Sequence, residues 1–382
     1  MSEWKEYKLG EVGEIITGKT PSLHNPEDWG NEFLFITPSE YCNYEKYAKD
    51  SIRKLSVSGL ERLKKKVLPP KSILVTCIGS DMGKVVMNNV MCITNQQINA
   101  IVPYKEYDND FVYYSLLNAY DTLRVLGGDG TAVPIVNKSD FENIVLKMPS
   151  LVEQKRIAGV LSSLDDKIDL LNRENVTLEA LAETLFRHYF IENPDPTWKE
   201  GKLGDEFDFT MGQSPNGESF NEEGIGIPMY QGNADFGFRF PKRRVYTTQP
   251  TRFAEINDTL ISVRAPVGAQ NMATERCCIG RGVASFRYKN NPSYYSYTYY
   301  KLNSLLEEIK QFNDNGTVFG SISKSDFENL DIMIPDDRTI EMFQKQVKVN
   351  DDKIINNNNE IHTLIQTRDG LLPKLMSNEI NI

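Results

Sequence analysis

The chain has 382 residues and a formal net charge of −10 at pH 7. This length is enough for two domains with separate cores, and no apolar run approaches the roughly 20 residues that cross a bilayer. The start of the chain, MSEWK, lacks the basic and apolar regions of a signal peptide, so we predict a cytoplasmic protein without a membrane segment. Taken alone, the acidic balance weighs against a free-standing nucleic-acid binder, because phosphate contacts need Lys and Arg.

Residues 1–150 are typical of a mixed α/β domain. A turn sequence, GKTP at 18–21, precedes a β-prone run, SILVT at 72–76, and the segment CITNQQ at 92–97. Apolar spacing predicts a shorter helix over about 111–126. Strands and turns therefore dominate the first domain.

The end of this domain carries the segment KSDFEN at 138–143, which is followed by an apolar run ending at Pro149. We expect Ser139 or Asp140 to cap a short helix and Phe141 to pack inward. The same six residues return at 324–329, a displacement of 186, before an apolar run ending at Pro335. The chain therefore contains an internal duplication.

Residues 151–191 predict a long helix with a coiled-coil stripe. Apolar side chains recur at alternating steps of three and four, as expected for one face of a packed helix. The expected core residues are Ile157, Leu161, Leu164, Ile168, Leu171, Leu178 and Leu185.

Residues 192–335 repeat the first domain. The turn GQSP at 212–215, the β-prone run DTLIS at 258–262 and the segment CIGRGV at 278–283 follow in the same order, and a second short helix is expected over about 294–312. By contrast, 41–66 and 218–251 share little sequence. A duplicated scaffold with two different surfaces would have this pattern.

Residues 336–382 repeat the long helix. The stripe at the displacement of 186 contains Val347, Ile354, Ile361, Leu364 and Leu371. Polar residues also fall on it, namely Asn350, Asn357 and Arg368. Together with Asn175 of the first helix, the asparagines would lower stability but fix the register of a helix pair.

Chain reach predicts the direction of the two helices. A helix over 153–189 is roughly 55 Å long, whereas the link 190–197 spans at most about 30 Å. The two helices must therefore run antiparallel. The predicted fold class is α+β, with two similar mixed α/β domains joined by two long antiparallel coiled-coil helices in an internal pseudo-two-fold repeat.

Catalytic and metal motifs are missing from the sequence. The five cysteines lack paired spacing, and His24, His188 and His362 match neither a metal site nor a catalytic triad. The run GSDMGK at 79–84 is one residue too short between its glycines for a phosphate-binding loop. We therefore predict no catalytic residue, no metal site and no cofactor on this chain.

The order of these motifs resembles the DNA-specificity (S) subunit of type I restriction-modification systems. The resemblance rests on the Gly-x-[ST]-Pro turns, the run LISVRAPVG at 260–268, the repeated SDFE element, Pro149 and the helix start EQKRI at 153–157. It covers nearly the whole chain, including the duplication. The second helix departs from it, because DDRTI at 336–340 replaces the EQKRI start.

The resemblance implies two target recognition domains, at 1–150 and 192–335, held by the spacer helices at 151–191 and 336–382. Each domain would read one half of a split double-stranded DNA target, and the helices would set the unread gap. Two methyltransferase (M) subunits would supply adenine methylation with S-adenosylmethionine. Restriction (R) subunits would supply ATP- and Mg-dependent translocation and cleavage.

Side chains that could contact DNA are Arg, Lys, Asn and Gln at base edges, with Ser, Thr and Lys on phosphates. In the first domain the candidates are Lys19, Thr20, Lys64, Lys65, Lys66, Gln96 and Gln97. In the second they are Gln213, Ser214, Lys242, Arg243, Arg244, Arg264 and Arg281. Each could instead be a solvated charge or a turn former, and Arg264 and Arg281 could brace the fold.

The helices could also dock the M subunits. Charge reversal at Glu174 and Glu179, which we expect on the exposed face, should then weaken that association. Two other functions stay open. A duplicated protein-binding scaffold would show no preference among DNA sequences, and a self-contained DNA methyltransferase or nuclease would bind S-adenosylmethionine by itself.

Overall fold

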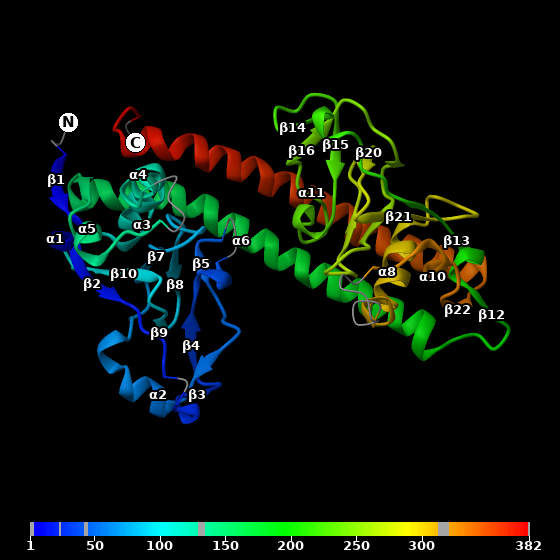
Figure 1. Ribbon diagram of the computed structural model, residues 1–382, viewed down its shortest axis with the longest axis horizontal. Helices are drawn as coiled ribbons and strands as arrows, with labels where there is room; N and C mark the ends of the chain where they lie inside the picture. The colour runs from blue at the N-terminus through cyan, green and yellow to red at the C-terminus, as the bar shows by residue number, and fades with distance from the viewer. Residues whose placement is uncertain (1–3, 23, 42–44, 129–133, 312–320, 381–382) are drawn as a thin grey trace. The chain divides into compact units, whose positions relative to one another are not determined.

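The computed structural model describes residues 4–22, 24–41, 45–128, 134–311 and 321–380. The chain divides into two compact units, Met1–Arg173 with Asn357–Ile382, and Glu174–Asn356. Each unit therefore contains one mixed α/β domain together with a stretch of each long helix (Figure 1).

The α/β domain of the first unit contains two sheets and a two-stranded ribbon. The ribbon pairs β1 (Lys5–Lys8) with β11 (Val145–Met148). The larger sheet has the order β2 (Gly13–Thr17), β10 (Ile98–Pro103), β7 (Ile73–Thr76), β8 (Val85–Asn88) and β5 (Tyr47–Ala48). The second sheet has the order β3 (Trp29–Gly30), β6 (Lys54–Leu55), β4 (Phe33–Ile36) and β9 (Cys92–Thr94).

Helices pack on both sheets of the first unit. They are α1 (Leu9–Val12), α2 (Val57–Arg62), α3 (Asn109–Asn118), α4 (Tyr120–Leu126), α5 (Lys138–Glu142) and the start of α6 (Leu151–Arg187). All four residues of β7 are buried because the sheet is covered on both faces. The second sheet and α2 lie on the side of the domain away from α6 (Figure 1).

The second unit repeats this plan. Its ribbon pairs β12 (Lys199–Lys202) with β22 (Asp331–Ile334). One sheet has the order β13 (Phe207–Met211), β21 (Val283–Tyr288), β18 (Thr259–Ser262) and β19 (Gln270–Met272). The other has the order β14 (Phe220–Asn221), β16 (Val245–Thr247), β15 (Ile227–Tyr230), β20 (Cys277–Ile279) and β17 (Phe253–Ala254).

The helices of the second unit also correspond to those of the first. They are α7 (Leu203–Glu206), α8 (Tyr295–Ser304), α9 (Leu306–Lys310), α10 (Lys324–Glu328) and the start of α11 (Asp337–Met376). Each shorter helix expected from the sequence is two helices, because the chain breaks at Ala119 and at Leu305. Phe312, the expected end of the second, lies outside the described residues.

The apolar stripes of the long helices face the cores of their own units. Leu161 and Leu171 are buried in the first unit, as are Val347 and Ile354 in the second. The other stripe residues divide into two groups. Ile157 and Ile168 are also buried, and Leu164, Leu178, Leu185, Ile361, Leu364 and Leu371 are half-buried.

Ion pairs join the two long helices within the first unit. In the first unit, Arg368 Nη1 lies 2.7 Å from Asp165 Oδ1, and Lys167 pairs with Glu360. As the position on α6 advances, its partner on α11 recedes, so the two segments run antiparallel within this unit. Burial alone would lower the pKa of Arg368, but Asp165 and Asp369 raise it above its usual value.

One expectation about the exposed helix face is wrong. Glu179 is largely buried and pairs with Arg239 of the second α/β domain at 3.3 Å. Glu174 pairs with Lys353 of α11 at 3.5 Å. Glu179 therefore holds the domain rather than facing a partner, and Arg239 could not be identified in advance because it lies in a diverged segment.

The expected cap of the KSDFEN helices is also wrong. Both α5 and α10 begin at the lysine, and the side chains of Asn137 and Ser323 cap them by accepting from the backbone N–H three residues later. The cap therefore lies before the repeated segment, where the side-chain oxygen can reach the first turn. Phe141 and Phe327 are fully buried, as expected.

A buried carboxyl group in the second unit has an unusual environment. Glu206 ends α7, and its Oε1 accepts a hydrogen bond of 2.7 Å from the Tyr297 hydroxyl. Burial raises the pKa of Glu206 to about 7, although Lys301 and Tyr297 oppose the change. Between pH 4.5 and about 7, Glu206 therefore stays protonated in the folded protein but loses its proton in the unfolded chain.

We expect Glu206→Gln to flatten the dependence of stability on pH. The folded-state pKa of about 7 lies above the ordinary 4.5, so the unsubstituted protein should lose stability as pH rises from 4.5 to 7, by about 3 kcal/mol in total. Urea unfolding between pH 5 and 8 measures this slope. An equal slope in both proteins would contradict the assignment.

Candidate nucleic-acid interface

In the first domain, the loop after β2 lies against the turn before β10. Lys19 N–H donates to the Thr94 carbonyl at 2.8 Å, and the Thr20 hydroxyl donates to Gln96 Oε1 at 2.7 Å. A Cβ on Gly18 would lie 2.1 Å from the Asn95 carbonyl oxygen, so only glycine permits this approach. Three of the predicted residues, Lys19, Thr20 and Gln96, are therefore neighbours.

Gln97 has a different position from Gln96. Its Oε1 accepts a hydrogen bond of 2.7 Å from the Asn95 side chain, and its backbone carbonyl accepts from Cys77 N–H at 2.7 Å. The side chain is half-buried, whereas those of Lys19 and Gln96 are exposed. Gln97 therefore joins the turn to the loop after β7, and Lys19 and Gln96 face solvent.

The second domain brings together the corresponding loops. Gln213 N–H donates to the Ile279 carbonyl at 3.0 Å, and Arg281 N–H donates to Ser214 Oγ at 3.3 Å. A Cβ on Gly212 would lie 2.2 Å from the Gly280 carbonyl oxygen. The two domains therefore build the same junction with different exposed side chains, Lys19 and Gln96 in one and Gln213 and Arg281 in the other.

Arg264 lies in the loop after β18, beside this junction. The preceding residue, Val263, donates its N–H to the Gly282 carbonyl at 2.9 Å, which ties the loop to the turn that carries Arg281. Both arginine side chains are exposed, and neither has a side-chain partner among the residues that the structure describes. Both are therefore positioned to bind an external anion.

The basic run of the first domain lies elsewhere. Lys64, Lys65 and Lys66 form a single 3₁₀ turn after α2, and their neighbours Leu63 and Val67 pack on the core of the second sheet. Lys64 and Lys65 are exposed. Within the described part of the chain, no hydrogen bond joins this run to the loops of Lys19 and Gln96.

The basic run of the second domain is partly used by the domain itself. Arg244 Nη2 lies 2.9 Å from Oδ1 of the buried Asp235, and Arg243 Nε lies 2.5 Å from Glu275 Oε1. The backbone of Lys242 donates to the Asp235 carbonyl at 2.7 Å. Arg243 and Arg244 therefore brace the fold, which reduces the positive charge that they offer to a ligand.

One basic residue of the first domain was not predicted. The guanidinium carbon of Arg53 lies 4.5 Å from the Trp29 ring centroid, at an open hollow of about 350 Å³ that also includes Asn31 and the exposed Ile52. Such stacking keeps a guanidinium planar and accessible. The diverged sequence around Arg53 contains no motif that would have identified it.

The described residues contain no group of three or more His, Cys, Asp or Glu side chains that could hold a metal ion. The cysteines that the structure describes are buried, and burial raises the pKa of Cys77 to about 11 and that of Cys92 to about 12. Cys42 lies outside those residues. No helix in the described ranges is both long and apolar enough to span a membrane.

Comparison with known proteins gives a consistent result. The model of the type I restriction modification DNA specificity domain matches residues 1–180 and 196–366. The chain is similar to the MjaIX specificity subunit of Methanocaldococcus jannaschii, with 26% identity over 414 residues that cover 100% of this chain and 94% of that protein. The MjaX specificity subunit of the same organism is 30% identical over 263 residues, and this match covers 65% of this chain and 62% of that protein.

A solved structure also shares the fold. The type I restriction-modification S subunit from M. genitalium aligns with a TM-score of 0.58 at 19% sequence identity. The alignment covers 98% of this chain and 96% of that one. At this level of identity the likeness establishes the architecture alone.

Proposed function

The chain belongs to the type I restriction modification DNA specificity family, and on this premise we propose that each of its two domains reads one half of a split double-stranded DNA target. The protein is a specificity subunit, and its role is DNA recognition with two domains. The observation that supports the split target is the repeated loop junction. The two junctions share their backbone hydrogen bonds but differ in their exposed side chains.

The exposed side chains have the chemistry that base reading requires. Arg pairs with guanine through two parallel hydrogen bonds, and Gln pairs with adenine in the same way. Gln96, held by Thr20, and Arg281, held through its backbone by Ser214, are the best-positioned readers in the two domains. Lys19 and the 64–66 run would contribute phosphate contacts, which set register rather than sequence.

We expect Arg281→Ala to weaken target binding by about 10- to 100-fold and to relax base preference in one half-site only. Loss of a bidentate contact removes discrimination at one base pair and leaves the other domain intact. Binding of the reconstituted complex to a DNA library measures both effects.

Arg276→Ala is the matched control, because Arg276 is also exposed in the second domain but pairs with Glu255 and stacks on Phe253. The assignment of Arg281 fails if both variants retain the original preference. It also fails if Arg281→Ala weakens all DNA sequences equally, since that result indicates a phosphate contact.

We further place the chemistry on partner subunits. Methylation with S-adenosylmethionine would be carried out by two methyltransferase subunits, and ATP- and Mg-dependent cleavage by restriction subunits. Membership of the specificity family supports this division. On this proposal the chain itself needs no cofactor.

A repeated exposed stripe on the long helices is the proposed docking site for the methyltransferase subunits. In the first unit it consists of positions 152, 156, 159, 163, 166 and 170 of α6, and in the second of the same heptad positions 338, 342, 345, 349, 352 and 356 of α11. Every position of both stripes is exposed, including the large side chains of Met342 and Val349. Two equivalent stripes suit two copies of one partner.

We expect Val349→Glu to weaken the binding of one methyltransferase copy at least about tenfold and to spare the fold, because the side chain makes no core contact. The stoichiometry of the purified complex, measured by native mass, should fall from two copies to one. Val176→Glu is the control, since Val176 is exposed on α6 outside the stripe. Unchanged stoichiometry for Val349→Glu would refute the docking site.

A further inference from the structure

A buried cation connects the first recognition domain to α6. The side chain of Lys46 is 4% exposed, and its Nζ lies 2.5 Å from Asp110 Oδ1. The same Nζ donates to Ser162 Oγ of α6 at 2.9 Å. Burial would raise the pKa of Asp110, but the hydrogen bond from Lys46 lowers it below its usual value. The pair is therefore charged inside the junction.

The second recognition domain also has a buried cation where it packs on the long helices. The side chain of Arg239 is 1% exposed, and its Nη2 lies 2.9 Å from Asp351 Oδ1 of α11. Its Nη1 lies 3.3 Å from Glu179 Oε1 of α6. One side chain of the recognition domain therefore binds both long helices of this unit.

Backbone hydrogen bonds show that these two cations are structural equivalents. The carbonyl of Lys46 accepts from Met87 N–H of β8 at 2.8 Å, and the carbonyl of Arg239 accepts from Met272 N–H of β19 at 2.9 Å. β8 and β19 occupy corresponding places in the two units, next to β7 and β18. Lys46 and Arg239 therefore occupy equivalent positions, beside β8 in the first unit and β19 in the second.

Each cation lies against an equivalent pair of tyrosine rings. Lys46 Nζ lies 4.9 Å from the ring centroid of Tyr114, and the guanidinium carbon of Arg239 lies 3.3 Å from that of Tyr299. Tyr113 and Tyr114 recur as Tyr299 and Tyr300 at the displacement of 186. Aromatic faces attract cations, and more strongly when water is excluded.

The tyrosines recur in the sequence of both copies, whereas the segments that contain the cations do not. The aromatic pair recurs in both copies, but 45–49 (EKYAK) and 238–242 (FRFPK) belong to segments that share little sequence. Each diverged segment nevertheless delivers a cation to the same place. The polar partners differ, because Lys46 pairs with Asp110 and Ser162 and Arg239 with Glu179 and Asp351. Both cations nevertheless lie against the equivalent tyrosines and bond to a long helix.

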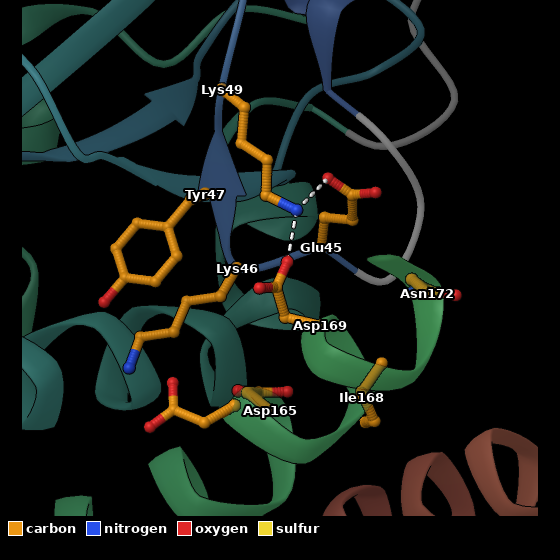
Figure 2. Close-up of a pocket in the computed structure, with 9 residues that line it drawn as sticks. Glu45, Lys46, Tyr47, Lys49, Asp165, Ile168, Asp169 and Asn172 are labelled. Carbon is orange, nitrogen blue, oxygen red and sulfur yellow. Dashed lines mark hydrogen bonds and ion pairs between the residues drawn. The ribbon is translucent and has the colours of Figure 1, made fainter. Parts of the chain in front are cut away.

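A second lysine of the first recognition domain also pairs with α6. Lys49 pairs with both Glu45 and Asp169, and a cavity of about 40 Å³ lies among these residues and Asn172 (Figure 2). Figure 2 shows the Lys49 side chain directed toward Glu45 and Asp169, and the Lys46 side chain directed away from them. Two cations therefore hold this domain on its helix, the buried Lys46 and the more exposed Lys49.

We propose that Lys46 and Arg239 are positioning residues that fix the recognition domains on the helices and thereby enforce the length of the unread gap in the target. The inference rests on the proposed function. One added base pair moves a half-site by about 3.4 Å and turns it by about a tenth of a helical turn. A domain held rigidly on its helix cannot bind the displaced half-site, whereas a loosely held domain can move with it and bind.

Arg239 needs a careful design, because its removal alone leaves two carboxylates buried without a partner and could unfold the domain. The variant Arg239→Met/Glu179→Gln/Asp351→Asn removes the cation and both charges together. Replacement of a whole buried charge cluster is generally tolerated. Urea unfolding establishes that the variant is folded before its specificity is measured.

The test uses the full chain with its methyltransferase partner and a DNA library in which both half-sites are fixed and the gap varies by single base pairs. We expect the triple variant to keep both base preferences, while its preference for the native gap falls at least about tenfold. Arg239→Lys should retain most of this preference, because lysine occupies the equivalent position in the first domain. The variant Lys46→Met/Asp110→Asn repeats the test independently if the triple variant does not fold.

Arg287→Met/Asp258→Asn is the matched control. It removes a partly buried ion pair of 2.7 Å within the second recognition domain, away from the helices. A folded cation-free variant with an unchanged gap preference would overturn the inference, as would equal relaxation in the control. If the unsubstituted complex shows no preference for a gap at all, the proposed function fails instead.

Discussion

Exchanging residues 1–150 for the matching segment of a relative should change one half of the DNA target completely and leave the other half unchanged. The reason is that each unit has its own sheets, core and loop junction. Side chains such as Lys19 and Gln96 would be replaced, while Gln213 and Arg281 would remain. Sequencing of methylated bases in cells that express the hybrid with its partner measures the result.

The reciprocal exchange of residues 192–335 is the control and should change only the other half. A hybrid that alters both halves would show that the two domains do not read DNA independently. A hybrid that leaves both halves intact would move base recognition to another subunit.

Arg368→Ala should destabilise the first unit by about 3–5 kcal/mol, because it leaves Asp165 buried without its cation. Asp165 would keep only the hydrogen bond of 2.5 Å from the Tyr114 hydroxyl. Urea unfolding followed by tryptophan fluorescence measures the loss. Trp4 and Trp29 report on the first unit and Trp198 on the second.

The matched variants for Arg368 separate burial from charge pairing. Lys353→Ala removes a pair with Glu174 whose partners are both more than one third exposed, so its cost should be about 0–1 kcal/mol. Arg368→Met/Asp165→Asn should recover much of the stability, because no charge is left buried. A loss for Arg368→Ala no larger than that for Lys353→Ala would contradict the role of the pair.

The duplication made much of the architecture predictable. The recurrence of KSDFEN and of the heptad stripe implied two similar α/β domains and two long helices, and the structure has both. The Gly-x-[ST]-Pro turns also led to Lys19, Thr20 and Ser214, which lie at the loop junctions. Repeated turns are predictable because tight backbone approaches, as at Gly18 and Gly212, restrict the sequence.

Contacts made by diverged segments could not be predicted. Arg239 lies in a stretch without a sequence counterpart, so Glu179 looked exposed although the two residues form an ion pair. Arg243 and Arg244 looked like a ligand-binding cluster, but their partners Glu275 and Asp235 are distant in sequence or unmarked by any motif. Charge patterns alone do not show which cations are paired inside a domain.

The polar residues on the helix stripe illustrate the same limit. Arg368 falls on the expected core stripe of the second long helix, and the structure pairs it with Asp165 of the other helix. A single helix read by itself cannot reveal such a partner. The pairing becomes apparent only when both stripes are placed side by side within one unit.

The most direct test of DNA recognition by this chain is the methylome of a host strain with and without it, in cells that make the cognate methyltransferase subunit. We expect deletion to remove one split methyl-adenine motif and complementation to restore it, which would give both half-sites and the gap together. An unchanged methylome in cells that make an active partner subunit would contradict the proposal that this chain directs methylation to a split target.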